Sequence, residues 1–574
     1  MFFSIEFSAL HRLAWAVLAV LIAQLPVVAD DSFPVTIRID ASKNLGQLKP
    51  IWRFFGADEP NYTTMKDGQK LLSDLGSLRP NEVFFRTHNL LTSGDGTPAL
   101  KWGSTDVYSE DKNGNPIYNW KIVDGIFDSL LQRGVRPYAQ IGFMPQLLST
   151  HPEPYRHNWR PGMPYEDVFT GWTYPPKDYD KWSELVYQWV KHCVDRYGQE
   201  EVETWYWQTW NEANIGGTNR PGYFTGSEDE FHRLHDYAIA GVRRALPTAR
   251  VGGPDSAGSG GNWSRNFFEH CLHGTNYATG EIGSPLDFVS FHAKGSPEYV
   301  DDHVRMGIAN QLRTIDEGFR IVASFPELKS TPIVIGESDP EGCAACQGPR
   351  FSYRNGTMYS SYTAASFARK HDLAERHDLN LAGALSWSFT FEDQPYFAGF
   401  RQLASNGIAL PVLNVIRMFG RMGIDRIAAE SDHTVSLDDI LRSGVRQSAD
   451  VGALASVDQS EKRITVMVWH YHDDDLVGPS AVIDLAFTNL PNDISTAELT
   501  HHRVDDQHSN AYATWIKMGS PVAPSNRQYR QLQQSSELAI LTDSADSIAV
   551  DHGSAKIKFT LPRQGVSLAT LQWK

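Results

Sequence analysis

Between about residues 50 and 425 the chain repeats one pattern: a short apolar run, a loop rich in Gly, Pro and Asp, and then a stretch with helical periodicity. This alternation is typical of βα units built around a parallel sheet. Eight units in roughly 375 residues predict a (β/α)₈ TIM barrel with enlarged loops, and a doubly wound sheet is the alternative. The eight candidate strands are Ile51–Gly56, Glu82–Arg86, Pro137–Gly142, Trp205–Trp210, Arg250–Gly253, Phe288–His292, Ile333–Glu337 and Gly383–Phe389.

The segment between the third and fourth strands predicts one barrel helix. Apolar residues recur there at spacings of three and four from Trp182 to Tyr197, and Gly198 follows them. That spacing places the apolar residues on a single face, and a glycine directly after the last of them is typical of a helix end. We therefore expect a helix over about 182–197 with one buried face.

After about residue 425 the pattern changes to short segments in which apolar and polar residues alternate. Such segments, separated by polar turns, are typical of a β-sandwich. The α/β chain is thus expected to hold a barrel over 50–425 and a C-terminal β-sandwich over 426–574, and an alternating strand within 30–49 can join the sandwich. The candidate sandwich strands are Ile464–Trp469, Val482–Phe487, Ala497–Val504, Ala539–Leu541 and Lys556–Leu561.

Residues 1–29 have the organisation of a secretory signal peptide. His11 and Arg12 precede an apolar run from Leu13 to Leu25, and Ala29 precedes two aspartates. The run is shorter than the roughly 20 apolar residues that cross a bilayer, although a single-span anchor is the alternative. We expect cleavage after Ala29 and export to the periplasm or the medium, with no membrane contact after cleavage.

Charge and cysteine content exclude several classes of protein. The chain has 68 Asp and Glu against 52 Lys and Arg, a net charge of −16, whereas nucleic acid binding requires clustered basic residues. Four cysteines are too few for a disulfide scaffold. Cys343 and Cys346 form a lone CxxC, for which we expect a disulfide clip or free thiols rather than zinc ligands. The sequence predicts no cofactor and no metal, and it leaves homo-oligomerisation open.

Two glutamates stand where predicted strands end. Glu212 follows the fourth strand and Glu337 ends the seventh. Reacting groups of barrels lie at the carboxyl ends of strands, so the two carboxylates are expected to share one cavity. Cleavage of a glycosidic bond needs such a pair, one to protonate the departing oxygen and one to attack the anomeric carbon. A single strand-end glutamate is more often a salt-bridge partner, but two together, one preceded by Asn211, favour catalysis.

The remaining strand ends supply candidates for substrate binding, each with a structural alternative. Asn211 can bond the sugar 2-hydroxyl. His88 and His292 are as readily buried histidines bonded to backbone as sugar contacts. Lys294 can clamp a substrate carboxylate or pair with a structural acid. Trp387 can stack on a sugar ring or fill the core.

Six longer stretches carry a resemblance to a known family. They are FFRTHNLLTSGDG (84–96), GVRPYAQIGFMP (134–145), YPPKDYDKWSELV (174–186), WNEAN (210–214), DFVSFHAKG (287–295) and DDQHSNAYATWIKMGSP (505–521). In this order they resemble glycoside hydrolase family 39, the β-xylosidase and α-L-iduronidase family, over most of the chain after residue 29. The resemblance implies a (β/α)₈ barrel with a β-sandwich, Glu212 as acid/base, Glu337 as nucleophile, and hydrolysis with retained anomeric configuration.

Three positions depart from the usual family pattern. The usual WNEPN is WNEAN here, and Gln140 stands where many members have Glu. Lys294 follows His292 by two, where xylosidase members often have Tyr. With the stretch 337–340 this lysine resembles the iduronidase branch, whose equivalent Lys and Asp lie near the uronate carboxylate, and Arg401 can be a further cation there.

The predicted function is a retaining β-xylosidase that releases xylose from the non-reducing ends of xylo-oligosaccharides. The xylosidase-like layout, including the stretch 391–400, favours neutral xylosides over uronides. A hexuronidase of the iduronidase kind, or another exo-glycosidase, is the alternative enzyme. A non-catalytic carbohydrate-binding protein is the alternative from another class, and it would keep the aromatic residues without requiring both glutamates. For retention we expect the two carboxyl groups about 5–5.5 Å apart.

Overall fold

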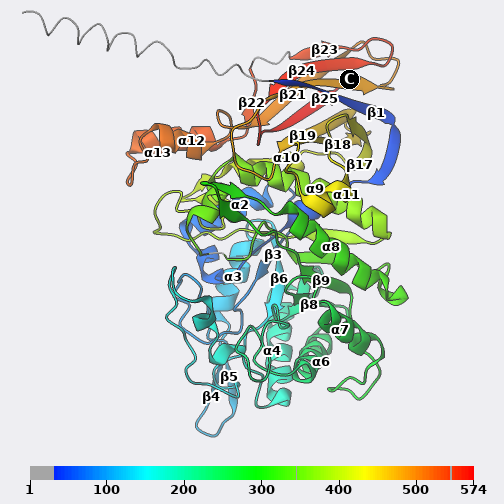
Figure 1. The fold of residues 1–574 in the computed structure, drawn as a ribbon. Helices are drawn as coiled ribbons and strands as arrows, with labels where there is room; N and C mark the ends of the chain where they lie inside the picture. Colours follow the sequence, from blue (N-terminus) through cyan, green and yellow to red (C-terminus); the bar gives the residue numbers. More distant parts are fainter. Residues whose placement is uncertain (1–31, 344, 543–545) are drawn as a thin grey trace, which may run out of the picture.

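Two sheets organise the chain. The computed structural model describes residues 32–343, 345–542 and 546–574, so the predicted signal peptide over 1–29 lies outside the described residues. One sheet forms a parallel barrel, and a second, mostly antiparallel sheet lies beside it, above the barrel in Figure 1. Among the helices described here, none is both long and apolar enough to cross a membrane.

The parallel sheet closes into a barrel in the order β13-β12-β9-β8-β7-β6-β3-β2-β14. Its strands are β2 (Phe54–Ala57), β3 (Val83–Thr87), β6 (Val135–Ile141), β7 (Tyr206–Thr209), β8 (Arg250–Ser256), β9 (Phe288–His292), β12 (Ile333–Glu337), β13 (Leu381–Ala384) and β14 (Ser386–Trp387). The eighth predicted strand is divided, since β13 pairs with β12 and β14 pairs with β2. Because β13 and β14 follow one another in the chain, they connect the β12 edge of the sheet to the β2 edge and close the barrel. This confirms the TIM barrel and excludes the doubly wound sheet.

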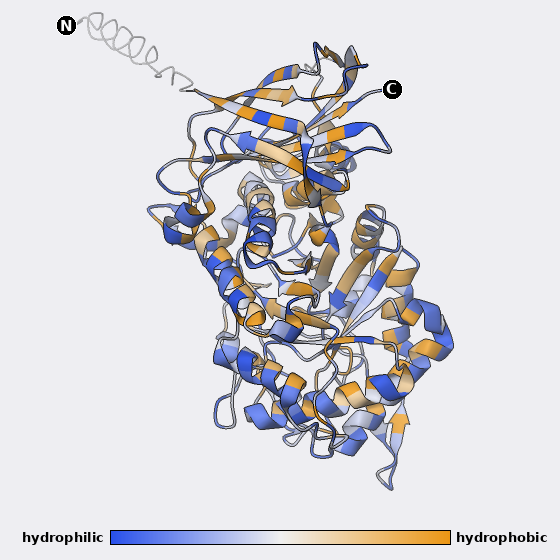
Figure 2. Ribbon diagram, turned by 90° about the vertical axis from the view of Figure 1, so that its right-hand side faces the viewer, coloured by the Kyte–Doolittle hydropathy of each residue, from blue (hydrophilic) through white to orange (hydrophobic). Residues whose placement is uncertain are grey.

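A helix follows each of the eight barrel strands. The helices are α2 (Lys66–Gly76), α3 (Lys121–Leu131), α4 (Tyr179–Tyr197), α6 (Glu228–Ala245), α7 (Asn262–His273), α8 (Ile308–Ala323), α9 (Thr357–His377) and α10 (Pro411–Phe419). The predicted helix over 182–197 is α4. Asp178 caps it by accepting from the Lys181 N–H, and Gly198 ends it with φ of 87°. In Figure 2 hydrophobic colour is prominent on the central strands, while the surrounding helices alternate between hydrophilic and hydrophobic residues, as amphipathic helices do.

The second sheet has ten strands that curl around their own hydrophobic core. They are β1 (Phe33–Gln47), β17 (Asp425–Ser431), β18 (Asp450–Asp458), β19 (Arg463–Tyr471), β20 (Ala481–Thr488), β21 (Thr496–Val504), β22 (Ala539–Ile540), β23 (Ser547–Ala549), β24 (Ala555–Leu561) and β25 (Val566–Gln572). β1 lies between β17, to which it is antiparallel, and β20, to which it is parallel. Leu499 of β21 and Ile557 of β24 share the core although their strands lie near opposite ends of the sheet. The predicted sandwich is therefore present.

Four strands of this domain were not predicted from the sequence: β17, β18, β23 and β25. The two long central ones, β18 and β25, are buried along nearly their whole length. Strand β18 shows the reason, because Val451 and Ala455 enter the core of the sheet domain while Leu454 joins the core of the barrel. A strand covered on both faces lacks the alternation of polar and apolar residues on which the prediction depended.

Shorter elements lie in the loops. Beside the barrel these are α5 (Gln199–Val202), β4 (Tyr108–Glu110), β5 (Pro116–Tyr118), β10 (Glu298–Val300), β11 (His303–Arg305), β15 (Ala404–Ser405) and β16 (Ile408–Ala409). In the sheet domain they are α11 (Leu437–Ser443), α12 (Ala511–Lys517) and α13 (Asn526–Ser536). The loop after β6, over 142–178, is the longest connection between a barrel strand and its helix among the described residues, and with the loop after β7 it walls the site described next.

Candidate active site

Glu212 is presented just after β7 by an uncommon backbone conformation. Trp210 and Glu212 have positive φ values of 63° and 46°, a region that residues other than glycine seldom adopt and that often occurs at functional sites. The Glu212 N–H donates to the carbonyl oxygen of Asp255, 2.9 Å away, and so ties this turn to β8. The carboxylate is therefore held, nearly buried, at the carboxyl end of the barrel strands.

Glu337 ends β12 and faces Glu212 inside the barrel. One carboxylate oxygen of each residue lies within 4.8 Å of the other. The ammonium of Lys294, two residues after β9, lies 3.0 Å from Oε1 of Glu212 and 2.8 Å from Oε2 of Glu337. The structure thus brings together the two predicted carboxylates and the predicted lysine, and the lysine contacts both.

The surrounding charges determine how these carboxylates titrate. Burial alone would raise the pKa of Glu212, but the Lys294 ammonium and the His292 hydrogen bond lower it to about 2. Burial also opposes ionisation of Glu337, yet Lys294, His292 and Arg401 hold its pKa well below the usual range. Both glutamates are therefore anions at neutral pH.

Arg86 of β3 is fully buried and organises the polar groups behind Glu337. It donates to Oε1 of Gln208 at 3.0 Å and to Oδ1 of Asn211 at 2.9 Å. It also lies 3.7 Å from Oε1 of Glu337 and 3.3 Å from Oδ2 of Asp255. Because an arginine can only donate, the contact with Asn211 orients that amide with its oxygen toward the guanidinium.

The two predicted histidines each have both ring nitrogens next to protein groups. His292 lies between Glu212, 2.8 Å from Nδ1, and Asp255, 3.3 Å from Nε2. Burial lowers the pKa of His292, but the carboxylates of Glu337, Asp255 and Glu212 outweigh it and raise the pKa. His88 has Nδ1 2.9 Å from Asp58 and Nε2 2.8 Å from Arg86. Since an arginine can only donate, Nε2 of His88 accepts and Nδ1–H donates to Asp58. Both rings therefore position charged neighbours.

Trp387 of β14 lies beneath the site. Its indole is fully buried and has the guanidinium of Arg401 at 5.4 Å and that of Arg86 at 5.9 Å from the ring centroid. Arg401 in turn donates to Oε2 of Glu337 at 3.2 Å. Trp387 is not among the residues that line the cavity described next. Of the two alternatives left open by the sequence, stacking on a sugar ring and filling the core, the buried contacts with two cations favour the second.

A cavity of about 730 Å³ opens over Glu212 and Glu337, and we call it the large cavity. Its polar lining includes Asp58, Tyr165, Tyr223, Lys294 and Arg401. Three of these residues were not predicted from the sequence: Asp58, Tyr165 and Tyr223. Asp58 follows β2 directly, so extending the strand-end rule by two residues would have found it. The tyrosines stand on the loops after β6 and β7, and their hydroxyls lie 2.5 Å apart. Loop packing of this kind leaves no periodic signal in a sequence.

Cys343 and Cys346 form a disulfide in the loop after β12, one of the two alternatives expected from the sequence. Cys343 and Gly342 line the large cavity. Arg354 pairs with Glu341 and donates to the Cys346 carbonyl at 2.9 Å, which fixes both ends of the loop. The disulfide therefore shapes one wall of the cavity beside Lys294.

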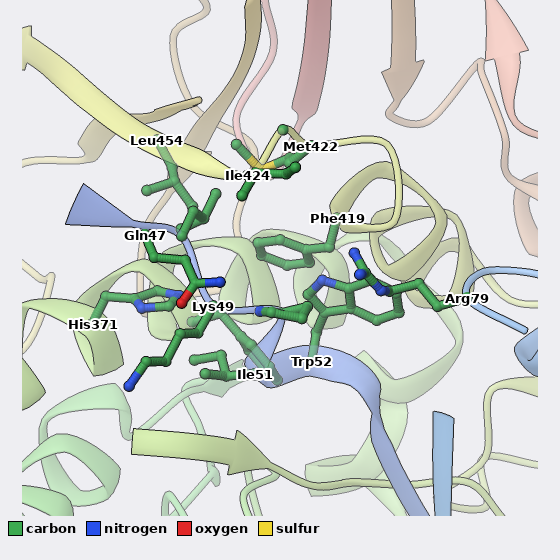
Figure 3. A pocket seen from close by; sticks show the side chains of 14 residues that line it. Gln47, Lys49, Ile51, Trp52, Arg79, His371, Phe419, Met422, Ile424 and Leu454 are labelled. Carbon is green, nitrogen blue, oxygen red and sulfur yellow. The ribbon is translucent and has the colours of Figure 1, made fainter. Parts of the chain in front are cut away.

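A second hollow lies between the barrel and the sheet domain, and we call it the interface hollow (Figure 3). It measures about 60 Å³. Trp52, Phe419, Met422 and Leu454 line it together with a few basic side chains, and no carboxylate is among its lining residues. It lacks the groups that bond cleavage requires, so the candidate site is the large cavity.

Two groups of three buried side chains, each including one or two carboxylates of the large cavity, have ligand atoms close enough to hold a metal ion. They are Asp58, His88 and Glu337, and Glu212, His292 and Glu337, with all ligand atoms of each group within 4.8 Å of one another. Lysine and arginine side chains already pair with these oxygens. The described residues therefore neutralise the carboxylates with their own cations.

The sequence family agrees with this site. The model of the "Glycosyl hydrolases family 39" matches residues 35–549. The chain belongs to this family. It is therefore a glycoside hydrolase, which confirms both the resemblance and the class of enzyme expected from the sequence.

Relatives within family 39 include two kinds of named enzyme. A β-xylosidase of Caldicellulosiruptor saccharolyticus is 22% identical over 521 residues, which cover 88% of this chain and 91% of that protein. An α-L-iduronidase of Mus musculus is 25% identical over 534 residues, which cover 87% of this chain and 75% of that protein. The crystal structure of a monomeric β-xylosidase from Caulobacter crescentus is similar with a TM-score of 0.71 and 20% identity, covering 94% of this chain and 99% of that one.

Proposed function

We propose that this family 39 enzyme is a retaining exo-glycosidase in which Glu337 is the nucleophile and Glu212 the acid/base. The observation that carries the proposal is the separation of the two carboxylates, which have oxygens within 4.8 Å of one another. Retaining enzymes hold their carboxyl groups about 5–5.5 Å apart, whereas inverting enzymes need about 6.5–9.5 Å to admit a water molecule. A cavity of about 730 Å³ has the size of a small-ligand site, which supports attack on the end of an oligosaccharide.

The assignment of roles follows from the charges around each carboxylate. Glu337 is surrounded by Lys294, Arg401 and Arg86, which keep it ionised as a nucleophile must be. It would bond to the anomeric carbon as Glu212 gives its proton to the departing oxygen. Glu212, again a carboxylate, would then take a proton from water as the water oxygen displaces Glu337, which restores both groups.

Lys294 imposes a condition on this cycle. With the ammonium 3.0 Å away, Glu212 has a pKa of about 2 and carries almost no proton at neutral pH. Proton donation therefore requires that a bound substrate draw Lys294 away from Glu212 or that it desolvate Glu212 further. As long as Lys294 pairs with both glutamates, Glu212 therefore has no proton to donate.

A β-D-xyloside is the first candidate substrate. The named β-xylosidases that cover most of the chain support it. A neutral pentose would leave Lys294 near Glu337 and rely on desolvation to raise the pKa of Glu212.

A uronide, such as an α-L-iduronide, is the second candidate, and a specific observation favours it. Lys294 and Arg401 both line the large cavity beside Glu337. A sugar carboxylate at this position would compete with Glu212 for Lys294 and so permit Glu212 to be protonated. The named iduronidase relatives support the same candidate.

The test is initial-rate hydrolysis of an aryl β-D-xyloside, an aryl α-L-iduronide and an aryl β-D-glucuronide, with the anomer released first identified by NMR. We expect retention for whichever substrate is turned over, and no turnover by Glu337→Ala. Release of the inverted anomer would contradict the proposed mechanism. Preference for the xyloside would make Lys294 a scaffold residue, and preference for a uronide would make it the group that binds the carboxylate.

A further inference from the structure

Asp58 is a charged residue in the large cavity that the proposed chemistry does not use. It follows β2 directly, and only about 10% of its side chain is exposed. It lines the large cavity together with Glu212 and Glu337. A buried charge without a function is costly, so its surroundings and its position need an explanation.

Its neighbours hold Asp58 ionised and in one orientation. Oδ1 is 2.9 Å from Nδ1 of His88, and Oδ2 pairs with the ammonium of Lys101. Burial raises the pKa of Asp58, but Lys101 and His88 outweigh it and leave the pKa below its usual value. An ionised carboxylate can only accept hydrogen bonds, and these two partners leave part of its capacity of about four bonds unused.

The position of Asp58 identifies the part of a substrate that it would meet. One of its oxygens lies within 4.8 Å of a Glu337 oxygen and of a His88 nitrogen. In a retaining reaction the nucleophile approaches the anomeric carbon from the face opposite the leaving group. A residue beside Glu337 therefore faces the sugar that becomes attached to the enzyme, and Glu212 faces the departing group.

We propose that Asp58 is a specificity-determining residue that accepts a hydrogen bond from a hydroxyl group of this sugar, the glycone. The inference rests on the proposed function. It gives the cavity two chemically different sides, because Lys294 and Arg401 present cations while Asp58 presents an anion. The anion favours a hydroxyl at its edge of the ring and rejects a negatively charged substituent there.

Deoxy substrates test the assignment. The probes are the aryl glycoside that the wild-type enzyme hydrolyses, β-D-xyloside or α-L-iduronide, and its 3-deoxy and 4-deoxy analogues. For one analogue we expect the wild-type enzyme to lose about 10- to 100-fold in kcat/KM, the effect of one hydrogen bond to a charged group. The ratio of kcat/KM for the parent glycoside to kcat/KM for that analogue should fall to about 1–3 in Asp58→Ala. In Asp58→Asn the ratio should lie between the wild-type value and that of Asp58→Ala.

The ratio is the decisive readout because both substrates are measured on one preparation. A partly folded variant, or a change in the reactivity of Glu337, lowers the rates on both substrates by the same factor. The ratio of the two rates is then unchanged. Asp74→Ala, at a half-buried aspartate of α2 that pairs with Lys70 and is not part of the large cavity's lining, is the control and should keep the wild-type ratios.

Two outcomes would overturn the assignment. One is an unchanged ratio for both analogues in Asp58→Ala, and the other is a wild-type enzyme that discriminates against neither analogue. Failure of the wild-type enzyme to hydrolyse any parent glycoside would instead overturn the proposed function, and with it this inference.

Discussion

The large cavity and the interface hollow lie against the same barrel, yet the side chains around them are held by different kinds of interaction. Around the large cavity buried acids meet buried cations, as at Glu337 with Lys294 and Arg401. Around the interface hollow the contacts are mainly apolar, as between Trp52, Phe419 and Leu454. Buried ion pairs add little net stability, because desolvation offsets their attraction, whereas apolar burial stabilises directly. The charged region is therefore expected to control activity and the apolar region to control stability.

The largest effect should follow removal of the nucleophile. Glu337→Gln keeps the size of the side chain but removes the attacking oxygen anion, so we expect kcat to fall by ~10⁴-fold or more. Initial rates on the substrate that the wild-type enzyme prefers measure this. Lys294 still has Glu212 as a partner, Arg86 still has Asp255, and Arg401 lies 4.0 Å from Asp339, so the midpoint of unfolding in urea should change little compared with the activity.

Glu82→Gln is a matched control for the nucleophile variant. Glu82 precedes β3 at the other end of the barrel and pairs with Arg79 at 2.8 Å on a half-exposed surface. The same chemical change there should leave kcat and KM near the wild-type values. A similar loss of activity in both variants would mean that the loss in Glu337→Gln does not come from removal of the nucleophile.

The next largest effect should come from Glu212→Ala, and it should depend on the leaving group. Without the acid we expect a loss of about 10²–10⁴-fold for poor leaving groups and a much smaller loss for activated aryl glycosides. Azide should restore part of the rate and yield a glycosyl azide of retained configuration, since a small anion can occupy the space of the lost carboxylate. Equal loss on all substrates, with no effect of azide, would count against the acid/base role.

Lys294→Met should move the pH profile more than it lowers the maximal rate. Lys294 depresses the pKa of Glu212, so its removal should raise that pKa from about 2 toward the usual value of a glutamate, because burial is then opposed mainly by His292. General-acid catalysis is lost as the pH rises through the pKa of the acid. The alkaline limb of kcat/KM for a neutral aryl glycoside should therefore shift upward by one pH unit or more.

Lys181→Met is the control for this shift. Lys181 pairs with Glu110 at 2.8 Å on the outside of the barrel and should leave the profile in place. A Lys294→Met profile that coincides with that of the wild-type enzyme would show that Lys294 does not set the titration of Glu212.

The features that could be predicted from the sequence are those with a regular spacing. The barrel strands could be located because each is a short apolar run, and Glu212 and Glu337 could be singled out because each stands where a run ends. The division of the eighth strand at Leu385 was not predictable, since it depends on pairing with β12 on one side and β2 on the other.

The contacts that the site residues make were harder to predict from the sequence than the residues themselves. The sequence offered His88 and His292 as sugar contacts or as buried histidines, and only the fold reveals which groups lie beside their ring nitrogens: Asp58, Arg86, Glu212 and Asp255. These contacts join residues from different strands. A periodic pattern within one segment carries no information about such long-range partners.

The smallest effect on activity should come from Leu454→Ala at the interface hollow. Leu454 of β18 is 2% exposed and belongs to the barrel core although its strand lies in the other domain. Truncation should lower the free energy of unfolding by about 2–4 kcal/mol, the usual range for a buried leucine, measured by urea denaturation. Leu45→Ala, at a leucine of β1 that is 45% exposed, should change the free energy of unfolding by less than about 0.5 kcal/mol.

The activity of both leucine variants should stay at the wild-type level. At a urea concentration that leaves both variants folded, kcat and KM should match the wild-type values, because the apolar contacts stabilise the domain interface and the charged groups of the large cavity remain in place. A rise in KM in Leu454→Ala alone would instead show that the sheet domain helps to hold the active site in shape.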